Sequence, residues 1–391
     1  MSLDLDRSTW QRVKLSDLVR NVNEYFVPER DGVLPFVAGP HIDMESAVVS
    51  RWGSTDAEDF PPTFKRLFQP GDVLLHSRGV EKVASVDRAG VTGEKLFVLR
   101  TLNADILDQR LLVWLLRSPM ALRYFEANFS GSVNKFLNWK PLAAFHFDLP
   151  PLDQQRRIAH LLWSTEDLAA SGERLCLSLE AVRESILDEH ASRAPSKRLA
   201  ELAVKVSDGP FGSKIKTEHY SENPGVRVIR LQDIGLGQLH DHDVAWLRDE
   251  HVEENLSGYR LSSNDVLVAG LGDERNPVGR AAPATDVGGA VHKADIFRVI
   301  VRSELLSAPY LMNVMNSPSV QRKIRARSQG TTRLRINTKN IREVLVPCAT
   351  PPEQHALMAK LEQLDGTVRF VDSELRRCAE LKDSILSELA P

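Results

Sequence analysis

The sequence is poor in cysteine. Its 391 residues include only Cys176, Cys348 and Cys378, which lie far apart. An odd number at such spacing argues against a disulfide framework and a thiolate zinc site, and it is typical of a reducing compartment. No apolar run approaches the roughly 18 residues of a membrane span, and the first residues, "MSLDLDRSTWQRVKL", do not form a secretory signal. We therefore expect a cytoplasmic protein with no membrane contact.

The chain also lacks a charge excess of either sign. It has 50 Lys and Arg against 53 Asp and Glu, a net charge of −3, which counts against a simple polyanion binder. Any nucleic-acid face must then be local. A hydrophobic share of 42% and a charged share of 26% are typical of a globular protein, and the length allows two domains.

The usual catalytic motifs are missing as well. No "GxxxxGK[ST]" loop, Gly-x-Ser-x-Gly elbow or Asn-Pro-Pro-aromatic methylation motif occurs. "GLGQLH" and "GLGDER" lack the third glycine of a dinucleotide fingerprint. "HDHD", from His240, alternates in a polar loop, which favours a solvated face over a metal cluster. We predict that the chain has no catalytic residue and binds no metal or cofactor.

What the sequence does contain is an internal repeat. "PPLDQQRRIAHLL" begins at Pro150 and "TPPEQHALMAKLE" at Thr350, so that Gln354 follows Gln155 by 199 positions. At this offset Gly131, Asn138 and Lys140 match Gly330, Asn337 and Lys339. Further upstream the offset is 193, where "GDVLL" lies over "NDVLV". The chain is thus a tandem duplication of about 190 residues per copy.

Each copy has the same order of predicted elements. Short β-like runs such as "DVLVAG" come first, and a pair of helices follows, the second starting at a Ser-Pro. A loop, a strand ("FHFDL" or "EVLVP") and a long helix close the copy. This pattern predicts an α+β protein with two mixed α/β domains. The expected divisions are domains over 1–149 and 197–347, long helices over 150–190 and 348–391, and a linker over 191–196.

The two long helices carry apolar residues at alternating spacings of three and four. This heptad spacing is typical of a coiled coil, and equal length in equivalent positions favours mutual antiparallel packing. Each helix covering only its own domain is the alternative. Gly172 and Gly366 interrupt the helices as possible bends. The predicted seam is Ile158, Leu161, Thr165, Leu168, Gly172, Leu175, Leu179, Val182 and Ile186 in the first helix, and Leu357, Leu361, Leu364, Val368, Val371, Leu375, Cys378, Lys382, Ile385 and Leu389 in the second.

A basic segment follows the helix pair of the second copy. Gln321–Arg342 holds eight cations and no acid, with Gly, Thr and Asn between them. Such a composition suits phosphate contacts with donors left for base edges, although a solvated basic face is the plainer alternative. The matching segment of the first copy is less basic. Its aromatics Tyr124, Phe125 and Phe129 are expected in the core.

A second group of candidates lies earlier in the second copy. In "SDGPFGSKIK" (Ser207–Lys216), glycines allow a tight turn that presents two lysines. Arg230 and Gln232 are expected at alternate positions of one strand, hence on one side of it. Arg suits guanine and Gln suits adenine in the major groove. A surface turn and an ordinary edge strand are the alternative interpretation.

Taken together, these residues resemble the specificity (S) subunit of type I restriction–modification systems, the HsdS family. The resemblance rests on the "GVRVIRLQDI" and "NDVLV" strands, the "SQGTT…IN" loop and the Pro-Pro-x-x-(E/Q)-Gln helix entry. It covers nearly the whole chain. The first copy departs from the pattern, with "GVLPFVAGPHI", no "DGPFGSK" turn and "DQQ" in place of "PEQ".

The resemblance implies a prokaryotic, non-catalytic DNA-recognition subunit whose two target-recognition domains each read one half of a split site. The long helices would space the domains and dock methyltransferase subunits, two of them, and restriction subunits through the complex. S-adenosylmethionine, ATP and Mg²⁺ are expected in those partners. In the second copy we predict DNA contacts by Lys214, Lys216, Arg230, Gln232, Arg327, Thr331, Thr332, Arg333, Arg335, Asn337 and Lys339. In the first copy we predict them by Arg78, Lys82, Ser132, Asn134, Lys135, Asn138 and Lys140.

Two other functions stay open at this point. A coiled-coil adaptor with two protein-binding modules would share the architecture, and the basic segment favours DNA over it. A self-sufficient fused restriction enzyme is disfavoured by the missing motifs.

Overall fold

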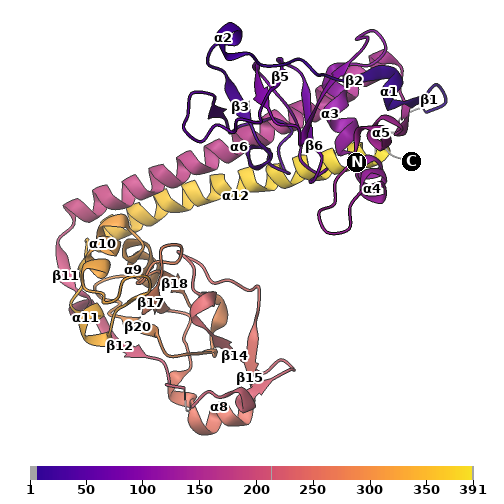
Figure 1. The fold of residues 1–391 in the computed structure, drawn as a ribbon. Coiled ribbons are helices and arrows are strands. Elements are labelled where there is room, and N and C mark those ends of the chain that lie inside the picture. The colour runs from indigo at the N-terminus through magenta and orange to yellow at the C-terminus, as the bar shows by residue number, and fades with distance from the viewer. Residues whose placement is uncertain (1–6, 213, 390–391) are drawn as a thin grey trace. The chain divides into compact units, whose positions relative to one another are not determined.

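The computed structural model describes residues 7–212 and 214–389, which form two compact units (Figure 1). The first unit joins the residues up to Arg174 with those from Phe370, and the second is Leu175–Arg369. Each unit therefore contains one of the two mixed α/β domains and parts of both long helices. The division follows the internal repeat rather than the order of the chain.

The first unit is built on two four-stranded sheets, ordered β2-β9-β6-β7 and β4-β3-β8-β5. The pair β3 and β8 is parallel, and the short pair β1–β10 is antiparallel. Its elements are β1 (Gln11–Lys14), α1 (Leu15–Leu18), β2 (Val19–Asn21), α2 (Pro28–Asp31), β3 (Pro35–Val37), η1 (Gly39–His41), β4 (Gly53–Ser54), β5 (Arg66–Phe68), β6 (Val73–His76), β7 (Val83–Ser85), β8 (Gly90–Thr92), β9 (Leu96–Thr101), α3 (Gln109–Arg117), α4 (Pro119–Ala127), α5 (Trp139–Ala143), β10 (His146–Leu149) and parts of α6 (Leu152–Arg193) and α12 (Pro351–Glu388).

The second unit repeats this plan, with sheets ordered β12-β20-β16-β18 and β13-β15-β14-β19. Here β14 and β19 form the parallel pair, and β11–β22 is the short antiparallel one. Its further elements are β11 (Ser196–Arg198), α7 (Leu199–Leu202), β12 (Ala203–Asp208), η2 (Thr217–His219), β13 (Tyr220–Ser221), β14 (Val226–Ile229), η3 (Leu231–Asp233), β15 (Ala245–Leu247), α8 (Asp249–Asn255), η4 (Ser257–Tyr259), β16 (Asp265–Ala269), β17 (Leu271–Gly272), β18 (Ala281–Pro283), η5 (Thr285–Val287), β19 (Val291–His292), β20 (Ile296–Val301), α9 (Ala308–Met315), α10 (Pro318–Ala326), β21 (Leu334–Arg335), α11 (Thr338–Arg342) and β22 (Leu345–Pro347).

The central strands β6 and β16 each contain an unbroken apolar run because both of their faces are buried. In β6, Val73 and Leu75 belong to the core beneath the helices, whereas Leu74 belongs to the core toward the second sheet. β16 alternates in the same way, with Val268 on the helix side and Leu267 on the other. Successive strand residues point to opposite faces, so a strand between two cores needs an unbroken apolar run. This explains the "DVLL" and "DVLV" phrases.

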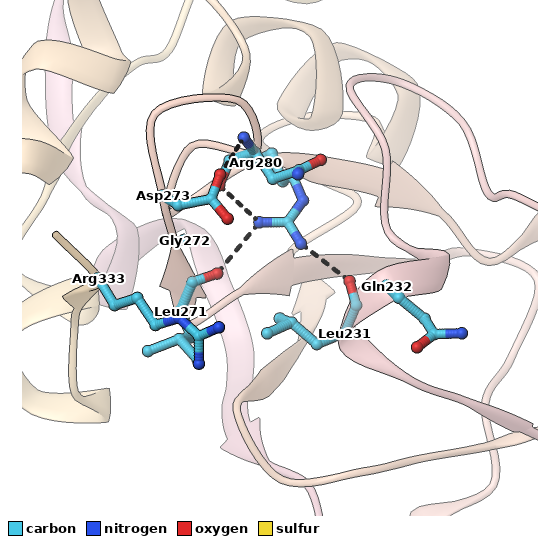
Figure 2. A pocket seen from close by; sticks show the side chains of 8 residues that line it. Leu231, Gln232, Leu271, Gly272, Asp273, Arg280 and Arg333 are labelled. Carbon is cyan, nitrogen blue, oxygen red and sulfur yellow. Dashed lines mark hydrogen bonds between the residues drawn. The ribbon is translucent and has the colours of Figure 1, made fainter. Parts of the chain in front are cut away.

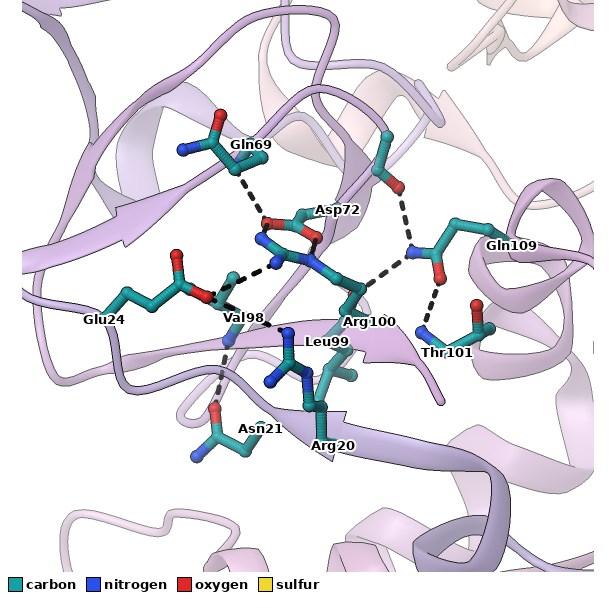
Figure 3. A network of polar contacts seen from close by, with 11 residues as sticks. Arg20, Asn21, Glu24, Gln69, Asp72, Val98, Leu99, Arg100, Thr101 and Gln109 are labelled. Carbon is teal, nitrogen blue, oxygen red and sulfur yellow. Dashed lines mark hydrogen bonds and ion pairs between the residues drawn. The ribbon is translucent and has the colours of Figure 1, made fainter. Parts of the chain in front are cut away.

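An ion pair with a buried aspartate stands at the start of each of these strands, and Figure 3 shows the one in the first unit. Asp72 accepts from Arg100 Nε and Nη2 at 2.6 and 2.7 Å, and its Oδ2 also accepts from the Gln69 amide at 2.8 Å. In the second unit Asp265 accepts from Arg298 Nε at 2.7 Å. The bond to Asp72 raises the pKa of Arg100. Each pair fixes the entrance of a central strand against its neighbour.

The Ser-Pro in each helix pair starts a new helix, as the sequence predicted. Ser118 Oγ accepts from the Ala121 amide at 3.3 Å, and Ser317 Oγ accepts from the Val320 amide at 3.4 Å. Each serine is an N-cap with proline in the first turn, where proline loses no helical hydrogen bond. Phe125 is fully buried, and Tyr124 and Phe129 pack against the same core.

The long helices run past each other in opposite directions within each unit. In the first unit Lys382 Nζ lies 3.4 Å from Glu166 Oε2, and in the second Arg183 Nε lies 3.3 Å from Asp365 Oδ1. The two ion pairs are related by the 199-residue offset of the repeat. Helix α6 ends at Arg193, inside the range expected to be linker.

Half of the seam predicted for α6 is wrong. Leu161, Leu168, Leu175 and Val182 are exposed by 38%, 54%, 45% and 46%, whereas Leu162 is fully buried. The inward positions are buried or half-buried and follow spacings of four then three: Ile158, Leu162, Thr165, Ala169, Gly172, Cys176, Leu179, Arg183 and Ile186. The four inward positions that replace these residues are Leu162, Ala169, Cys176 and Arg183, and three of them are small or charged, which is why a choice by hydrophobicity missed them.

In α12 the predicted seam positions are all buried or half-buried. Helix α6 is continuous through Gly172. A Cβ at Gly172 would lie 2.8 Å from Leu375 Cδ2, so the glycine permits close packing of the helices. Gly366 likewise lies inside the continuous α12. Among the described residues, no helix has the length and apolar character that crossing a bilayer requires.

Candidate nucleic-acid interface

Three segments that are far apart in the sequence meet at one open pocket of the second unit (Figure 2). They are the turn after β14, the hairpin between β17 and β18, and the loop before β21. Gln232 comes from the first segment, Asp273 and Asn276 from the second, and Arg333 from the third. The structure thus brings together Gln232 and Arg333, which the sequence predicted separately.

Arg280 holds this pocket together. Its side chain is 3% exposed. It donates to the carbonyls of Leu231 (2.8 Å) and Ile234 (2.7 Å) in the turn, and to those of Leu271, Asn276 and Pro277 (3.1 Å each) in the hairpin. Burial lowers the pKa of Arg280, with the charge of Asp273 acting against this. A guanidinium whose three nitrogens all donate to main-chain carbonyls can hold two loops in a fixed relation.

The strand expected to carry Arg230 and Gln232 ends too early for both. β14 ends at Ile229, and Gln232 lies in the short helix η3. The two side chains nevertheless meet at Asp243, whose Oδ2 lies 3.1 Å from Arg230 Nη1 and 3.3 Å from Gln232 Nε2. Arg230 also lies 3.5 Å from Asp233. The two side chains therefore lie on one side, as expected, but through a turn and a shared contact with Asp243 rather than through a strand. Arg230 is engaged within the protein.

The loop of residues 329–335, here the second tip loop, is closed by a backbone bridge between Gln329 and Arg335. Gly330 has φ 106°, and a Cβ there would lie 2.3 Å from the Arg333 carbonyl oxygen, so the turn requires glycine. Arg335 Nη2 lies 2.6 Å from Asp295 Oδ1. No ion pair of Arg333 occurs within residues 7–212 and 214–389. Of the two arginines, Arg333 is the one that faces the pocket without a partner.

The remaining candidates around this loop differ in their roles. Arg327 ends α10 as its C-cap. Asn337 caps α11 by accepting from the Asn340 amide at 2.8 Å. Thr331, Thr332 and Lys339 are exposed. The second tip loop thus presents hydroxyls and cations to solvent from a fixed backbone.

Lys214 and Lys216 lie away from this pocket, beside the sheet that contains β14. Lys214 Nζ is 5.2 Å from the centre of the Tyr259 ring, and Lys216 Nζ is 3.7 Å from Glu218. Neither lysine lines the pocket. The structure therefore does not join this predicted group to the other one.

The first unit has a tip loop of the same form, residues 130–136, closed by a bridge between Ser130 and Phe136. Gly131 has φ 91°. The predicted residues Ser132, Asn134, Lys135, Asn138 and Lys140 are exposed, and Asn138 Nδ2 donates to Ser130 Oγ at 3.0 Å. Val133 at the tip is 89% exposed. The two tip loops share a backbone and differ in side chains.

Lys82 is engaged within the protein. Its Nζ donates to the Gly39 carbonyl at 3.1 Å, and the residue is half-buried. It occupies the place of Arg280: the Lys82 carbonyl pairs with His76 N, as the Arg280 carbonyl pairs with Ala269 N. Each cation therefore joins the β-hairpin of its unit to the turn that follows a strand of the second sheet, β3 in the first unit and β14 in the second. Arg78, in the same hairpin, is exposed.

Sequence reasoning missed Arg280 and the hairpin loop that carries Asp273. A signal was present, because the offset of the repeat increases between "GDVLL" and "NSP" and so requires extra residues in the second copy. From β6 to β7 the structure has residues 76–83, whereas from β16 to β18 it has 269–281. Most of the extra residues are in this hairpin.

The "HDHD" segment is engaged with arginines rather than organised around an ion. Asp241 pairs with Arg227 and Asp243 with Arg230, while the rings of His240 and His242 stack 5.8 Å apart. Within the described parts of the chain, no group of three or more His, Cys, Asp or Glu side chains is arranged to hold a metal.

No protein-family model matches the chain. It is 24% identical over 305 residues to the EcoBI type I restriction enzyme specificity subunit of Escherichia coli, an alignment that covers 69% of this chain but only 63% of that relative. It is 20% identical over 406 aligned positions to the MjaVIII type I specificity subunit of Methanocaldococcus jannaschii, covering 97% and 92% of the two chains.

Two solved structures have the same fold. The type I restriction–modification system S subunit from M. genitalium superposes with a TM-score of 0.60 at 14% identity, covering 100% of this chain and 99% of that one. A chain from a study of complex assembly and conformational transition of the type I system superposes with a TM-score of 0.64 at 16% identity, covering 97% of each. The duplicated domains, the paired long helices and these relatives agree: the chain has the α+β fold of type I restriction–modification specificity subunits, the HsdS family.

Proposed function

We propose that this chain is the non-catalytic DNA-recognition subunit of a type I restriction–modification complex and reads a split site, one half with each unit. The observation that carries this proposal is the pair of tip loops. Both have the same bridge and the same glycine turn, but their exposed side chains differ. A constant backbone with different donors suits two readers of different sequence, since base edges are read by side chains.

The charge distribution supports the same proposal. The second tip loop and its flanks expose Arg333, Arg335 and Lys339, although the net charge of the chain is −3. Local cations on a slightly acidic protein give salt-dependent attraction to phosphates without making the whole surface bind polyanions.

The exposed residues of α6 support docking of a partner protein. Leu161, Leu168, Leu175 and Val182 recur every seven residues and are exposed. A heptad-spaced apolar row on a helix surface is the pattern by which helices pack. We assign this row to methyltransferase subunits, two per complex, with restriction subunits joining through them. S-adenosylmethionine, ATP and Mg²⁺ would bind in those partners, and the complex would work in the cytoplasm.

An adaptor with two protein-binding modules is the competing function, and the apolar row alone would fit it. Selection of duplexes from a random DNA library by the full chain with its methyltransferase subunit separates the two. We expect a two-part consensus and an affinity that falls steeply with salt. Recovery of duplexes with no consensus and no salt dependence would leave the adaptor as the function.

A further inference from the structure

The hairpin loop of residues 271–280 distinguishes the second unit from the first. In the first unit the corresponding connection is residues 77–82, between β6 and β7. The longer loop adds a short ladder, with Leu271 opposite Arg335 and Gly272 opposite Leu334. It therefore runs beside the second tip loop, and an element present in one copy only is a place where the two units differ in what they contact.

This loop is rigid although it is exposed. Asp273 Oδ1 accepts from the amides of Arg275 and Asn276 at 2.9 and 2.8 Å. Arg280 holds the Asn276 and Pro277 carbonyls from below. A Cβ on Gly272 would lie 2.1 Å from Val278 N, so the backbone is closely packed there. The loop is thus fixed before any ligand binds, which lowers the entropic cost of recognition.

The Asp273 carboxylate accepts from two backbone amides and also interacts with the Asn276 side chain, but its two oxygens are not used equally. Both turn hydrogen bonds use Oδ1, and Oδ2 takes part in neither. The backbone bonds lower the pKa of Asp273, so the group stays ionised. Figure 2 shows it on the same side of Arg280 as the Arg333 guanidinium, and both side chains line the pocket. An acceptor and a donor therefore face one space.

A fixed acid at a DNA-facing surface is suited to bases rather than to the backbone. A carboxylate repels phosphates, whereas it can accept a hydrogen bond from the N4 amino group of cytosine. Arginine donates to O6 and N7 of guanine. Cytosine and guanine are the two members of one base pair, so the acceptor and the donor match both edges of that pair in the major groove.

We infer that Asp273 and Arg333 together read one C·G base pair in the half-site of the second unit, with Asp273 on cytosine and Arg333 on guanine. This inference rests on the proposed DNA-recognition function. Arg280 is a positioning residue here, because it acts by holding the loop. The shorter hairpin of the first unit has no position that corresponds to Asp273; its acid, Glu81, directly precedes Lys82.

The test compares the full-length wild type with three variants, each with the methyltransferase subunit, by sequencing the duplexes that they select from a random library. Asp273→Asn keeps the Oδ1 acceptor of the turn but replaces Oδ2 by an amino group. We expect preference for C·G at one position of one half-site to fall about 10- to 100-fold. All other positions should be unchanged. Arg333→Ala should relax the same base pair.

Glu274→Gln is the matched control, since it removes one charge from the neighbouring position, which does not line the pocket. It should select the wild-type consensus. The half-site of the first unit reports in every case that the protein is folded and bound.

Two outcomes would overturn this inference alone: an unchanged consensus for Asp273→Asn, or tighter binding to all sequences equally, which would mean that the acid only repels phosphate. A wild-type protein that selects no consensus would overturn the proposed function, and the inference with it.

Discussion

Gln155 and Gln354 make the same three hydrogen bonds in the two units. Gln155 Oε1 accepts from the Asp108 amide at 2.9 Å, and its Nε2 donates to the carbonyls of Ile106 (2.9 Å) and Pro150 (2.8 Å). Gln354 Oε1 accepts from the Ser307 amide at 3.1 Å, and its Nε2 donates to the carbonyls of Leu305 (2.8 Å) and Ala349 (2.9 Å). Every partner is shifted by 199 positions. The repeated sequence at the helix entries thus contains a glutamine whose buried side-chain amide joins each long helix to its domain.

Replacing either glutamine by methionine should destabilise the protein by roughly 3 kcal/mol, because the side chain keeps its length while three backbone groups lose their partners in a buried site. Gln363→Met, at an exposed position of α12, is the control and should stay within about 0.5 kcal/mol. Urea unfolding of the three variants measures this. Equal midpoints for Gln155→Met and Gln363→Met would contradict it.

The two symmetry-related ion pairs should not contribute equally. Glu166 is 8% exposed and also accepts from the Ala47 amide at 2.6 Å, whereas the Asp365 side chain is 40% exposed. We expect Glu166→Ala to cost about 2–3 kcal/mol, since it leaves a buried amide and Lys382 without an acceptor. Asp365→Ala should cost under about 1 kcal/mol, as exposed pairs do. Thermal unfolding of both variants is the measurement, and the reverse order would be inconsistent with the structure.

The corrected seam of α6 makes a prediction about neighbouring leucines. Leu162→Ala should cost about 2–4 kcal/mol because it empties a fully buried position. Leu168→Gln should leave stability within about 0.5 kcal/mol, yet weaken binding of the methyltransferase subunit, since Leu168 is exposed in the apolar row. Denaturation combined with gel filtration of the mixed subunits tests both. Should Leu168→Gln lower the stability by as much as Leu162→Ala and leave subunit binding unchanged, the row would belong to the internal seam.

Stability at acid pH should depend on His292. This side chain is fully buried and its Nδ1 lies 3.0 Å from the Ile296 carbonyl oxygen. Burial lowers the pKa of His292 to about 4 from 6.5. The unfolded chain therefore binds the proton first, so this contribution is complete above about pH 6.5 and is lost as pH falls toward 4. The loss amounts to roughly 3 kcal/mol.

His292→Asn, which retains an amide donor toward Ile296, should flatten the fall in stability between pH 6.5 and 4. His355→Asn, at an exposed position of α12, serves as the control and should keep the wild-type slope. Unfolding free energies measured across this pH range decide the matter. A slope that is the same in the wild type and His292→Asn would show that other groups produce it.

The cations of the second tip loop and of α11 should affect DNA binding in two different ways. Lys339→Ala should weaken binding to all duplexes alike and reduce the salt slope by about one. Arg333→Ala should cost roughly 1–3 kcal/mol on the preferred duplex only. Arg335→Ala should impair both less directly, since it releases Asp295 and loosens the loop. Salt titrations on cognate and scrambled duplexes distinguish these effects, and three identical responses would mean that the loop contacts phosphate only.

The internal repeat held information about the α6 seam that a choice by hydrophobicity did not use. Carrying the α12 seam back by 199 positions gives Ile158, Leu162, Thr165, Ala169 and Gly172, which are the inward positions that the structure shows. Choosing by hydrophobicity failed at Leu161 and Leu168 because those leucines form an exposed row. Apolar character marks a helix face, but it does not say whether that face packs inside the chain or awaits another protein.

The pocket was beyond sequence reasoning for a different reason. Gln232 and Arg333 could be named as donors from their surroundings, but nothing local places them together, since three segments converge only in the folded unit. Arg280 follows a Gly and precedes two alanines, a context with no sign of a buried cation. Its role depends on carbonyls nearly 50 positions away, at Leu231 and Ile234.

Arg280 and Lys82, each holding the hairpin of its own unit, also bear on how such a protein diverges over generations. Because a single cation anchors the hairpin through main-chain oxygens, it holds connections of different length and places no demand on the side chains they display. Insertions there can accumulate while the sheet beneath stays the same. New specificities can then arise by drift at the surface of one copy, while its duplicate goes on working.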